Sequence, residues 1–139
     1  MTLRRKSREY ALQMLFQWDI GKQDPSRIEE GFWRNARAQK STRDFANQLF
    51  ENAAARVAEL DPIISTHAQN WRIERISAID RAILRLAIHE LRQPETPPKV
   101  VLNEAIELAK KFSGADAAPF INGILDAVRK ALPGAQARA

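Results

Sequence analysis

The sequence contains no cysteine among its 139 residues. Disulfide bridges, thiol nucleophiles and zinc ribbons are therefore excluded together, and the composition suits a reducing compartment, so we expect the cytoplasm. The N-terminus is basic, but the amphipathic segment after it carries Glu9, Gln13, Gln17 and Asp19 where a secretory signal needs an apolar block. We therefore expect no export signal.

Long apolar runs are also missing. The longest uninterrupted stretches are only a few residues, such as residues 100–102, whereas crossing a bilayer takes about 20 consecutive apolar residues. We therefore expect a soluble protein that does not enter the membrane. Apolar residues still make up 45% of the chain, which is enough to bury the core of one ordinary domain.

Glycine and histidine are scarce and scattered. The five glycines form no glycine-rich phosphate loop, so nucleotide hydrolysis is not expected. His67 and His89 lack partners at metal-binding spacing, which favours core or surface histidines. Glu104, Glu107 and Asp126 lie in amphipathic segments, where acidic residues usually pair with nearby lysines. The sequence therefore predicts no catalytic site, no metal and no cofactor.

Apolar residues recur at spacings of three and four in nearly every segment, and no period-two alternation is present. This pattern predicts an all-α fold. Helices are expected over about residues 3–20, from Asp24-Pro25, from about residue 41 to residue 60, from Asp61-Pro62 to about residue 71, from Ser77 to about residue 91, over 101–112 and over 120–128.

Small polar residues and prolines mark the expected helix ends. Asp24-Pro25 and Asp61-Pro62 each place a capping carboxylate before a proline that suits a first turn. Ser41 and Asp44 have capping-box spacing, with Asp44 in the place of the usual glutamate. Gly21 supplies a residue that can end the first helix in a left-handed conformation.

The segment after Ser77 is expected to be the central helix, because residues 79–91 are apolar on more than one face. The proline-rich residues 93–98 must end that helix and form a loop. Gly114 is expected to end the following helix, and the small-residue tail 133–139 is expected to fray.

The net charge is +5, and part of it is concentrated at the N-terminus. This basic cluster precedes an aromatic-bearing segment, a combination that favours single-stranded nucleic acid. The alternative is a solvated first turn above an ordinary core stripe, and composition alone does not choose between the two. The cluster comprises Arg4, Arg5, Lys6 and Arg8, and the aromatic residues are Tyr10, Phe16 and Trp18.

Four segments carry a family resemblance. Residues 101–112 (VLNEAIELAKKF) together with 120–126 (FINGILD) resemble the C-terminal signature of the NusB family. Upstream, residues 79–91 (IDRAILRLAIHEL) are similar to the central helix of that family, and residues 8–16 (REYALQMLF) look like its arginine-rich opening helix. The resemblance covers nearly the whole chain in order, with residues 20–60 and the tail matching loosely.

The resemblance implies a single domain over residues 1–139, with about seven helices in two three-helix bundles and an N-terminal helix that bridges them. The halves would span about 1–74 and 75–132, before a frayed tail over 133–139. It also implies a function: proteins of this family bind the boxA element of nascent ribosomal RNA together with NusE, a small-subunit ribosomal protein. In the elongation complex with other Nus factors they help RNA polymerase read through terminators, and they catalyse no reaction.

Carried over to this sequence, the resemblance assigns phosphate contacts to the basic opening, Arg4, Arg5, Lys6 and Arg8. Such contacts give affinity and salt dependence but little sequence discrimination, because every nucleotide carries the same phosphate.

Base contacts are implied for three further residues. Phe16 and Phe120 stand where the family presents aromatic rings to RNA, although Phe16 replaces a frequent tyrosine and so loses any hydroxyl contact. The Asp116 carboxylate could accept from base amino groups, yet helix capping alone explains this residue as well. Both interpretations of Asp116 stay open.

The NusE interface is implied on the central and following helices, at exposed positions such as Asp80, Leu84, Arg85 and Glu104. The alternative for Leu84 is a place in the core, since one face of each helix must be buried.

The sequence allows two rival hypotheses. The chain could be an isolated NusB-like domain of the kind found in RNA cytosine methyltransferases, but it has no strand-rich second half and no glycine-rich cofactor loop, and its tail is expected to be a natural end. It could also be a structural helical module without salt-dependent RNA affinity. A monomer would leave the RNA-facing surface free, whereas a homodimer would cover it as an inactive reserve, and composition does not decide between these two oligomeric states.

Overall fold

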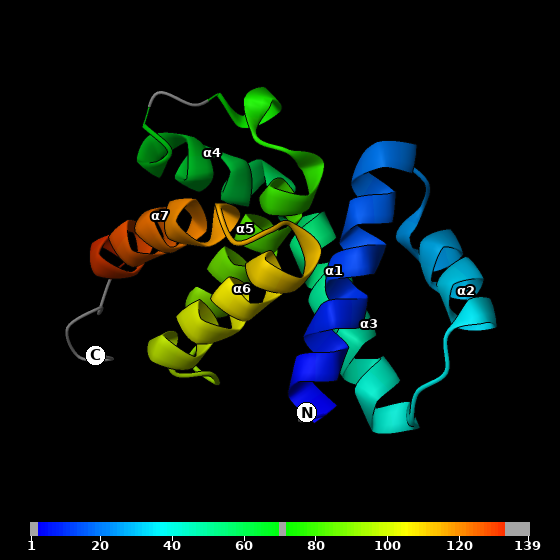
Figure 1. The fold of residues 1–139 in the computed structure, drawn as a ribbon. Helices are drawn as coiled ribbons and strands as arrows, with labels where there is room; N and C mark the ends of the chain where they lie inside the picture. Colours follow the sequence, from blue (N-terminus) through cyan, green and yellow to red (C-terminus); the bar gives the residue numbers. More distant parts are fainter. Residues whose placement is uncertain (1–2, 70–71, 133–139) are drawn as a thin grey trace. The chain divides into compact units, whose positions relative to one another are not determined.

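The computed structural model describes residues 3–69 and 72–132 (Figure 1). Within these ranges the chain forms seven α-helices and one short 3-10 helix, with no strand, so the prediction of an all-α fold with about seven helices is confirmed. In chain order these are α1 (Leu3–Gly21), α2 (Pro25–Asn35), α3 (Lys40–Ala55), α4 (Val57–His67), the 3-10 helix η1 (Ile73–Arg75), α5 (Ala78–Leu91), α6 (Pro98–Phe112) and α7 (Ala117–Ala131). No helix in the described part of the chain combines the length and the apolarity needed to cross a membrane.

The chain divides into two compact units, residues 1–56 and residues 57–139. In the first unit α1 packs mainly on α3 and also on α2; in the second, α5 contacts α4, α6 and α7 (Figure 1). Helix α4, expected in the first half, therefore packs with the second unit. The predicted single domain with halves meeting near residue 74, and the bridging role of the first helix, stay predictions.

The core of the first unit lies along one face of α1. Ala11, Met14 and Leu15 are fully buried as predicted, whereas Trp18 is only half-buried. The apolar spacing of three and four residues places the first three on the face that packs against α3. A hydrogen bond from the Ser7 hydroxyl to a backbone oxygen of α3, at 2.9 Å, adds a polar link between the two helices.

Helix α5 is the core of the second unit, because every residue from Ala82 to Leu91 is buried. This confirms the prediction of a central buried helix. One charged residue on it, Arg85, forms a bidentate pair with Asp61 of α4: Nε lies 2.8 Å from Oδ1, and a terminal nitrogen lies 2.8 Å from Oδ2. A buried guanidinium needs such a partner, since an unpaired charge in the core is strongly destabilising.

Two of the predicted helix starts are confirmed. The Asp24 carboxylate accepts a hydrogen bond from the Ser26 backbone N–H at 3.1 Å, and Pro25 occupies the first turn of α2. The Ser77 hydroxyl accepts from the Asp80 backbone N–H at 3.2 Å at the start of α5. In both places a side-chain oxygen satisfies a backbone donor that the helix leaves without a partner.

Two other predicted helix ends are wrong. The Ser41–Asp44 capping box does not form, because α3 begins at Lys40 and Asp44 instead pairs with the Lys40 ammonium at 2.8 Å. Gly21 remains within α1, and the left-handed residue is Lys22, at φ 56°. The Lys22 N–H still bonds to the Trp18 oxygen, at 2.8 Å, so the turn that the glycine was expected to make comes one residue later.

The expected helix through residue 60 is broken at Arg56, where the backbone N–H turns back to the Ala53 oxygen at 3.1 Å. Helix α4 therefore starts at Val57, and Asp61-Pro62 lies inside it rather than at its start. Pro62 is the sixth residue of α4, past the first turn, so α4 lacks the helical bond from residue 62 to the residue 58 oxygen. Trp71, predicted to face the core, and the predicted frayed tail lie outside the described residues.

Candidate nucleic-acid interface

The first two turns of α1 carry a cluster of cations. Arg4 is exposed, whereas Arg5 and Lys6 are half-buried. The Arg4 guanidinium lies 3.7 Å from the centre of the Phe45 ring, within the range of a cation–π interaction. The Lys6 ammonium lies 3.6 Å from the Glu9 carboxylate. This end of α1 therefore presents positive charge to solvent, and the contacts of Arg4 and Lys6 restrain two of these charges.

Arg8 differs from the other three basic residues because it is 6% exposed. Its guanidinium lies 6.0 Å from the centre of the Phe45 ring. Of the four predicted phosphate contacts, Arg8 has the least surface available to a ligand. Its basic neighbours in the sequence suggested a fully solvated run, but helical geometry turns residue 8 away from the direction of residue 6.

Phe16 is half-buried and lies on the same helix as the basic cluster. Residues 4 and 16 are separated by about 18 Å along the helix axis, at 1.5 Å per residue. The structure therefore places Phe16 three turns away from Arg4 and not beside the basic cluster.

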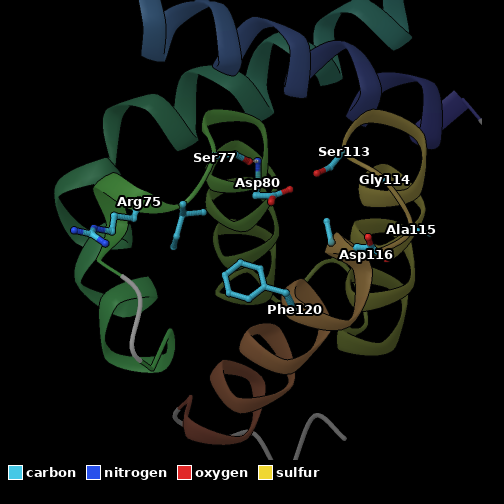
Figure 2. Close-up of a pocket in the computed structure, with 10 residues that line it drawn as sticks. Arg75, Ser77, Asp80, Ser113, Gly114, Ala115, Asp116 and Phe120 are labelled. Atoms are coloured by element: carbon cyan, nitrogen blue, oxygen red, sulfur yellow. Dashed lines mark hydrogen bonds between the residues drawn. The ribbon is translucent and has the colours of Figure 1, made fainter.

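The second unit contains a pocket of about 570 Å³ between the η1–α5 corner and the α6–α7 loop (Figure 2). It brings together Asp116 and Phe120, predicted RNA contacts, with Asp80, predicted to face a protein partner. In Figure 2 the side chains of Asp80, Ser113 and Phe120 surround the same space. The lining residues are Arg75, Ile76, Ser77, Asp80, Ser113, Gly114, Ala115, Asp116, Ala117 and Phe120.

The tight α6–α7 loop positions one wall of this pocket. Gly114 adopts φ 142°, a conformation that favours glycine, and its N–H donates to the Ala109 oxygen at 2.7 Å. Gly114 therefore ends α6 as predicted. Its own oxygen accepts from the Ala117 N–H at 3.2 Å, which starts α7 immediately. Asp116 and Phe120 are four residues apart across this start, so helical spacing places them on one side.

Asp116 occupies the N-cap position of α7, but in the described part of the chain its carboxylate makes no capping hydrogen bond. Its side chain is exposed and faces the pocket. The Asp116 carboxylate therefore does not cap α7, although capping was one of the two interpretations of this residue. The base contact remains a prediction.

The chemistry of the pocket suits an uncharged planar group. One carboxylate oxygen of Asp80, Oδ1, is buried and has no hydrogen-bond partner among the described residues. The exposed Asp116 carboxylate offers acceptors to amino groups, and the exposed Arg75 cation offsets part of the negative charge of the two aspartates. The Phe120 ring adds an apolar face on which a base can stack. The pocket can therefore bind a nucleobase.

The four predicted partner-binding residues have different surroundings. Asp80 lines the pocket and Glu104 is half-buried on α6. Leu84 is 0% exposed and Arg85 is 6% exposed, so the expectation that these two are exposed is wrong. Helices α4, α6 and α7 all pack on α5 and leave it little free surface. The alternative that Leu84 belongs to the core is confirmed.

Several pocket residues were not anticipated from the sequence. Arg75 ends the 3-10 helix η1, whose three residues are too few to produce a periodic signal. Ser113, Gly114 and Ala115 are small residues between two helices. The one signal that could have identified them is the run of small residues directly before Asp116, which leaves room beside a candidate base-binding carboxylate.

Sequence comparison places the chain among known proteins. The NusB family model matches residues 5–130. Transcription antitermination protein NusB of Koribacter versatilis is 48% identical over 131 residues, covering 93% of this chain and 90% of the relative. The protein of the same name from Elusimicrobium minutum is 45% identical over 132 residues, covering 91% and 93%.

Solved structures give the same result. NusB of T. maritima superposes with a TM-score of 0.83 and 30% identity, covering 94% of this chain and 93% of that one. A chain from the crystal structure of antitermination factors NusB and NusE in complex with dsRNA reaches a TM-score of 0.85 at 29% identity, covering 95% and 99%. By its sequence and by its fold, the chain belongs to the NusB family.

Proposed function

We propose that this protein is a transcription antitermination factor that binds the boxA element of nascent ribosomal RNA together with NusE. It acts within the RNA polymerase elongation complex with other Nus factors, in the cytoplasm, by binding and not by catalysis. The observation that carries the proposal is the identity of 48% to a transcription antitermination protein over 93% of the chain. Its likeness to a NusB chain solved with NusE and dsRNA adds support.

Affinity in this proposal comes from the N-terminal end of α1. Arg4, Arg5 and Lys6 attract the phosphates, with a smaller contribution from the buried Arg8. Each phosphate contact releases counterions from the RNA, so the binding constant falls as salt rises.

Selectivity comes from the pocket of the second unit. A base stacks on the Phe120 ring, and its amino group donates to the Asp116 carboxylate. Both residues line the same pocket of about 570 Å³, which is within the usual size of small-ligand sites. Phe16, half-buried on α1, supplies a second ring.

The first test is a titration of the purified protein, with and without NusE, against a fluorescent boxA-type single strand over a salt series. A scrambled strand and a boxA duplex serve as controls. We expect the tightest binding to the boxA strand, strengthened by NusE. Equal binding to the boxA and scrambled strands would leave the family assignment intact but contradict the function proposed here.

Variants of the basic cluster test the phosphate contacts. Arg4→Ala and Lys6→Ala should each reduce the slope of log K against log salt by about 0.7 for a single strand. Lys130→Ala is the matched control, because it removes the same charge from α7, where Lys130 pairs with Asp126 at 3.0 Å. A slope that changes equally in all three variants would show a general charge effect.

For NusE, we propose that Asp80 and Glu104 provide contacts, since both keep some accessible surface. Asp80→Arg and Glu104→Arg should weaken NusE binding in calorimetry. Because Asp80 also lines the pocket with Phe120, the same variants must be titrated with RNA alone. NusE affinity that is unchanged in either variant would remove that residue from the interface.

A further inference from the structure

A second recess lies entirely within the first unit, between α1 and α2. Its volume is about 340 Å³, close to the lower limit of small-molecule sites. Apart from Tyr10, which belongs to the aromatic segment after the basic cluster, none of its lining residues was assigned a role above, and none of them carries a formal charge. They are Tyr10, Gln13, Gln17, Gly31, Phe32, Asn35 and Ala36, which we call the α1–α2 groove.

Aromatic rings form one wall of the α1–α2 groove. The Tyr10 and Phe32 rings meet edge to face, with centroids 5.6 Å apart. The Trp33 ring packs edge to face against both rings, with its centroid 5.1 Å from that of Tyr10 and 4.9 Å from that of Phe32. Its indole N–H donates to the Asn47 side-chain oxygen at 2.8 Å. The Tyr10 hydroxyl donates to the Arg37 backbone oxygen at 3.3 Å. The wall is therefore held in place before any ligand arrives.

Three side-chain amides provide the polar part of the groove. The Gln13 amide nitrogen donates to the Glu9 backbone oxygen at 3.3 Å, which fixes its direction. Gln17 and Asn35 are exposed, so their amides are open to a ligand. An amide offers a donor and an acceptor side by side, which matches the paired donor and acceptor of a base edge, and Asn and Gln recognise adenine in this way.

The groove continues from the basic end of α1. Lys6, Tyr10, Gln13 and Gln17 are spaced by four, three and four residues, so they follow one face of the helix. The Lys6 ammonium lies 5.0 Å from the centre of the Tyr10 ring, at the boundary between cations and groove. A strand whose phosphate is held by Lys6 can therefore extend its next bases along the same helix face.

We propose that the α1–α2 groove binds one unstacked base, preferably adenine, of a single-stranded RNA segment that flanks the element recognised elsewhere on the protein. The base stacks on one of the two rings, Tyr10 or Phe32, which stand at 73° to each other, and pairs with the exposed amides. This inference rests on the RNA-binding function proposed above, and it adds a site to the basic cluster and the pocket of the second unit.

Gly31 allows the groove to be filled without damage to the fold. It lies within α2, and a Cβ atom built on it meets nothing within 4 Å. Gly31→Leu therefore puts a side chain at the lining of the groove while raising helix propensity. Gly123→Leu is the matched control, because Gly123 is also helical, has the same free space and lines neither pocket described above.

The experiment uses the full chain and two kinds of RNA. The first is the boxA-type core with and without an oligo(A) extension at either end, measured by fluorescence titration. We expect one extension to tighten binding by about tenfold, as the stacking of one base provides. Gly31→Leu and the double variant Gln17→Ala/Asn35→Ala should lose this gain, and Gly123→Leu should keep it. A gain that survives Gly31→Leu, or no gain in the wild type, would overturn the proposal.

The second RNA is a short oligo(A) alone, followed by NMR. The side-chain amide signals of Gln17 and Asn35 should shift in the wild type and in Gly123→Leu, but not in Gly31→Leu. This readout does not require boxA recognition. If these signals shift but the boxA core does not bind, the proposed function is wrong and the groove proposal is supported. If the core binds but these signals do not shift, only the groove proposal is wrong.

Discussion

The two units of the molecule present contrasting chemistry to a nucleic acid. The first carries Arg4, Arg5 and Lys6 at the accessible end of α1, where charge attracts any phosphate. The second carries a pocket with the Asp80 and Asp116 carboxylates beside an aromatic ring, which suits a base. Under the proposed function, affinity and selectivity come from different helices, and we expect that each can be changed without the other.

The largest expected effect concerns α5, on which the pocket is built. Leu84→Ala should lower the free energy of unfolding by about 2–5 kcal/mol, because Leu84 is fully buried and its loss leaves a cavity. Chemical denaturation measures this. Val100→Ala, at a position 43% exposed, is the control and should stay within about 0.5 kcal/mol. A loss below about 1 kcal/mol for Leu84→Ala would contradict the assignment of Leu84 to the core.

The next effect separates the two units directly. Phe120→Ala should weaken binding of the boxA strand by about 1–3 kcal/mol, the usual contribution of one stacked base, and leave the salt slope unchanged. Arg4→Ala should do the reverse, changing the slope with little effect on selectivity. Fluorescence titration over a salt series gives both quantities. If the salt slope and the selectivity change together in both variants, the two units do not contribute affinity and selectivity separately.

A smaller effect is expected at Asp116. Asp116→Asn removes a negative charge and replaces one acceptor oxygen with a donor, so the preference for boxA over a strand altered at one base should fall by about 1 kcal/mol. Affinity for the scrambled strand should rise slightly, because a charge that repels phosphate is gone. Competition between labelled strands measures the preference. An unchanged preference would indicate that Asp116 does not contact a base.

The smallest effect lies in the first unit, where burial, a hydrogen bond to Glu51 and the like charge of Glu51 raise the pKa of Glu29 to about 8 from 4.5. The folded state therefore binds a proton more tightly than the unfolded state, and this contribution to stability is lost as pH rises from about 4.5 through about 8. Glu29 is partly exposed, so we expect at most about 1 kcal/mol after screening by solvent.

Glu29→Gln should flatten the pH dependence of the free energy of unfolding over this range. The control is Glu30→Gln, which alters an exposed carboxylate paired with Arg34 at 3.0 Å. Denaturation at several pH values compares them. If the two variants follow the wild-type curve equally, Glu29 does not hold the extra proton.

The sequence was sufficient to predict the number of helices and the buried central helix, because helical spacing of apolar residues directly reflects the face that packs. The ends of the helices were harder to predict. Asp24 and Ser77 cap as expected, since their side chains need only the local backbone. The break at Arg56 and the left-handed Lys22 are changes of one or a few residues at helix ends, which the apolar spacing does not resolve.

The site was predicted less completely. Asp116 and Phe120 were recognised through the family resemblance, and the structure places both at one pocket. Leu84 and Arg85 were expected to be exposed because the resemblance implied a partner interface on this helix, but both are buried. The pattern of α5, apolar on more than one face, does not identify an outer side. The α1–α2 groove was not predicted, since its residues come from two helices whose relative placement the sequence does not contain.

The stacking of Arg4 on Phe45, with the ring centre 3.7 Å from the guanidinium, has a consequence for the thermodynamics of binding. A long arginine side chain normally loses many rotamers when a ligand fixes it, at a cost of about 0.5–1.5 kcal/mol. Arg4 has given up much of that freedom during folding. If Arg4 holds a phosphate as proposed, the entropy of ordering this cation is lost during folding and not during RNA binding.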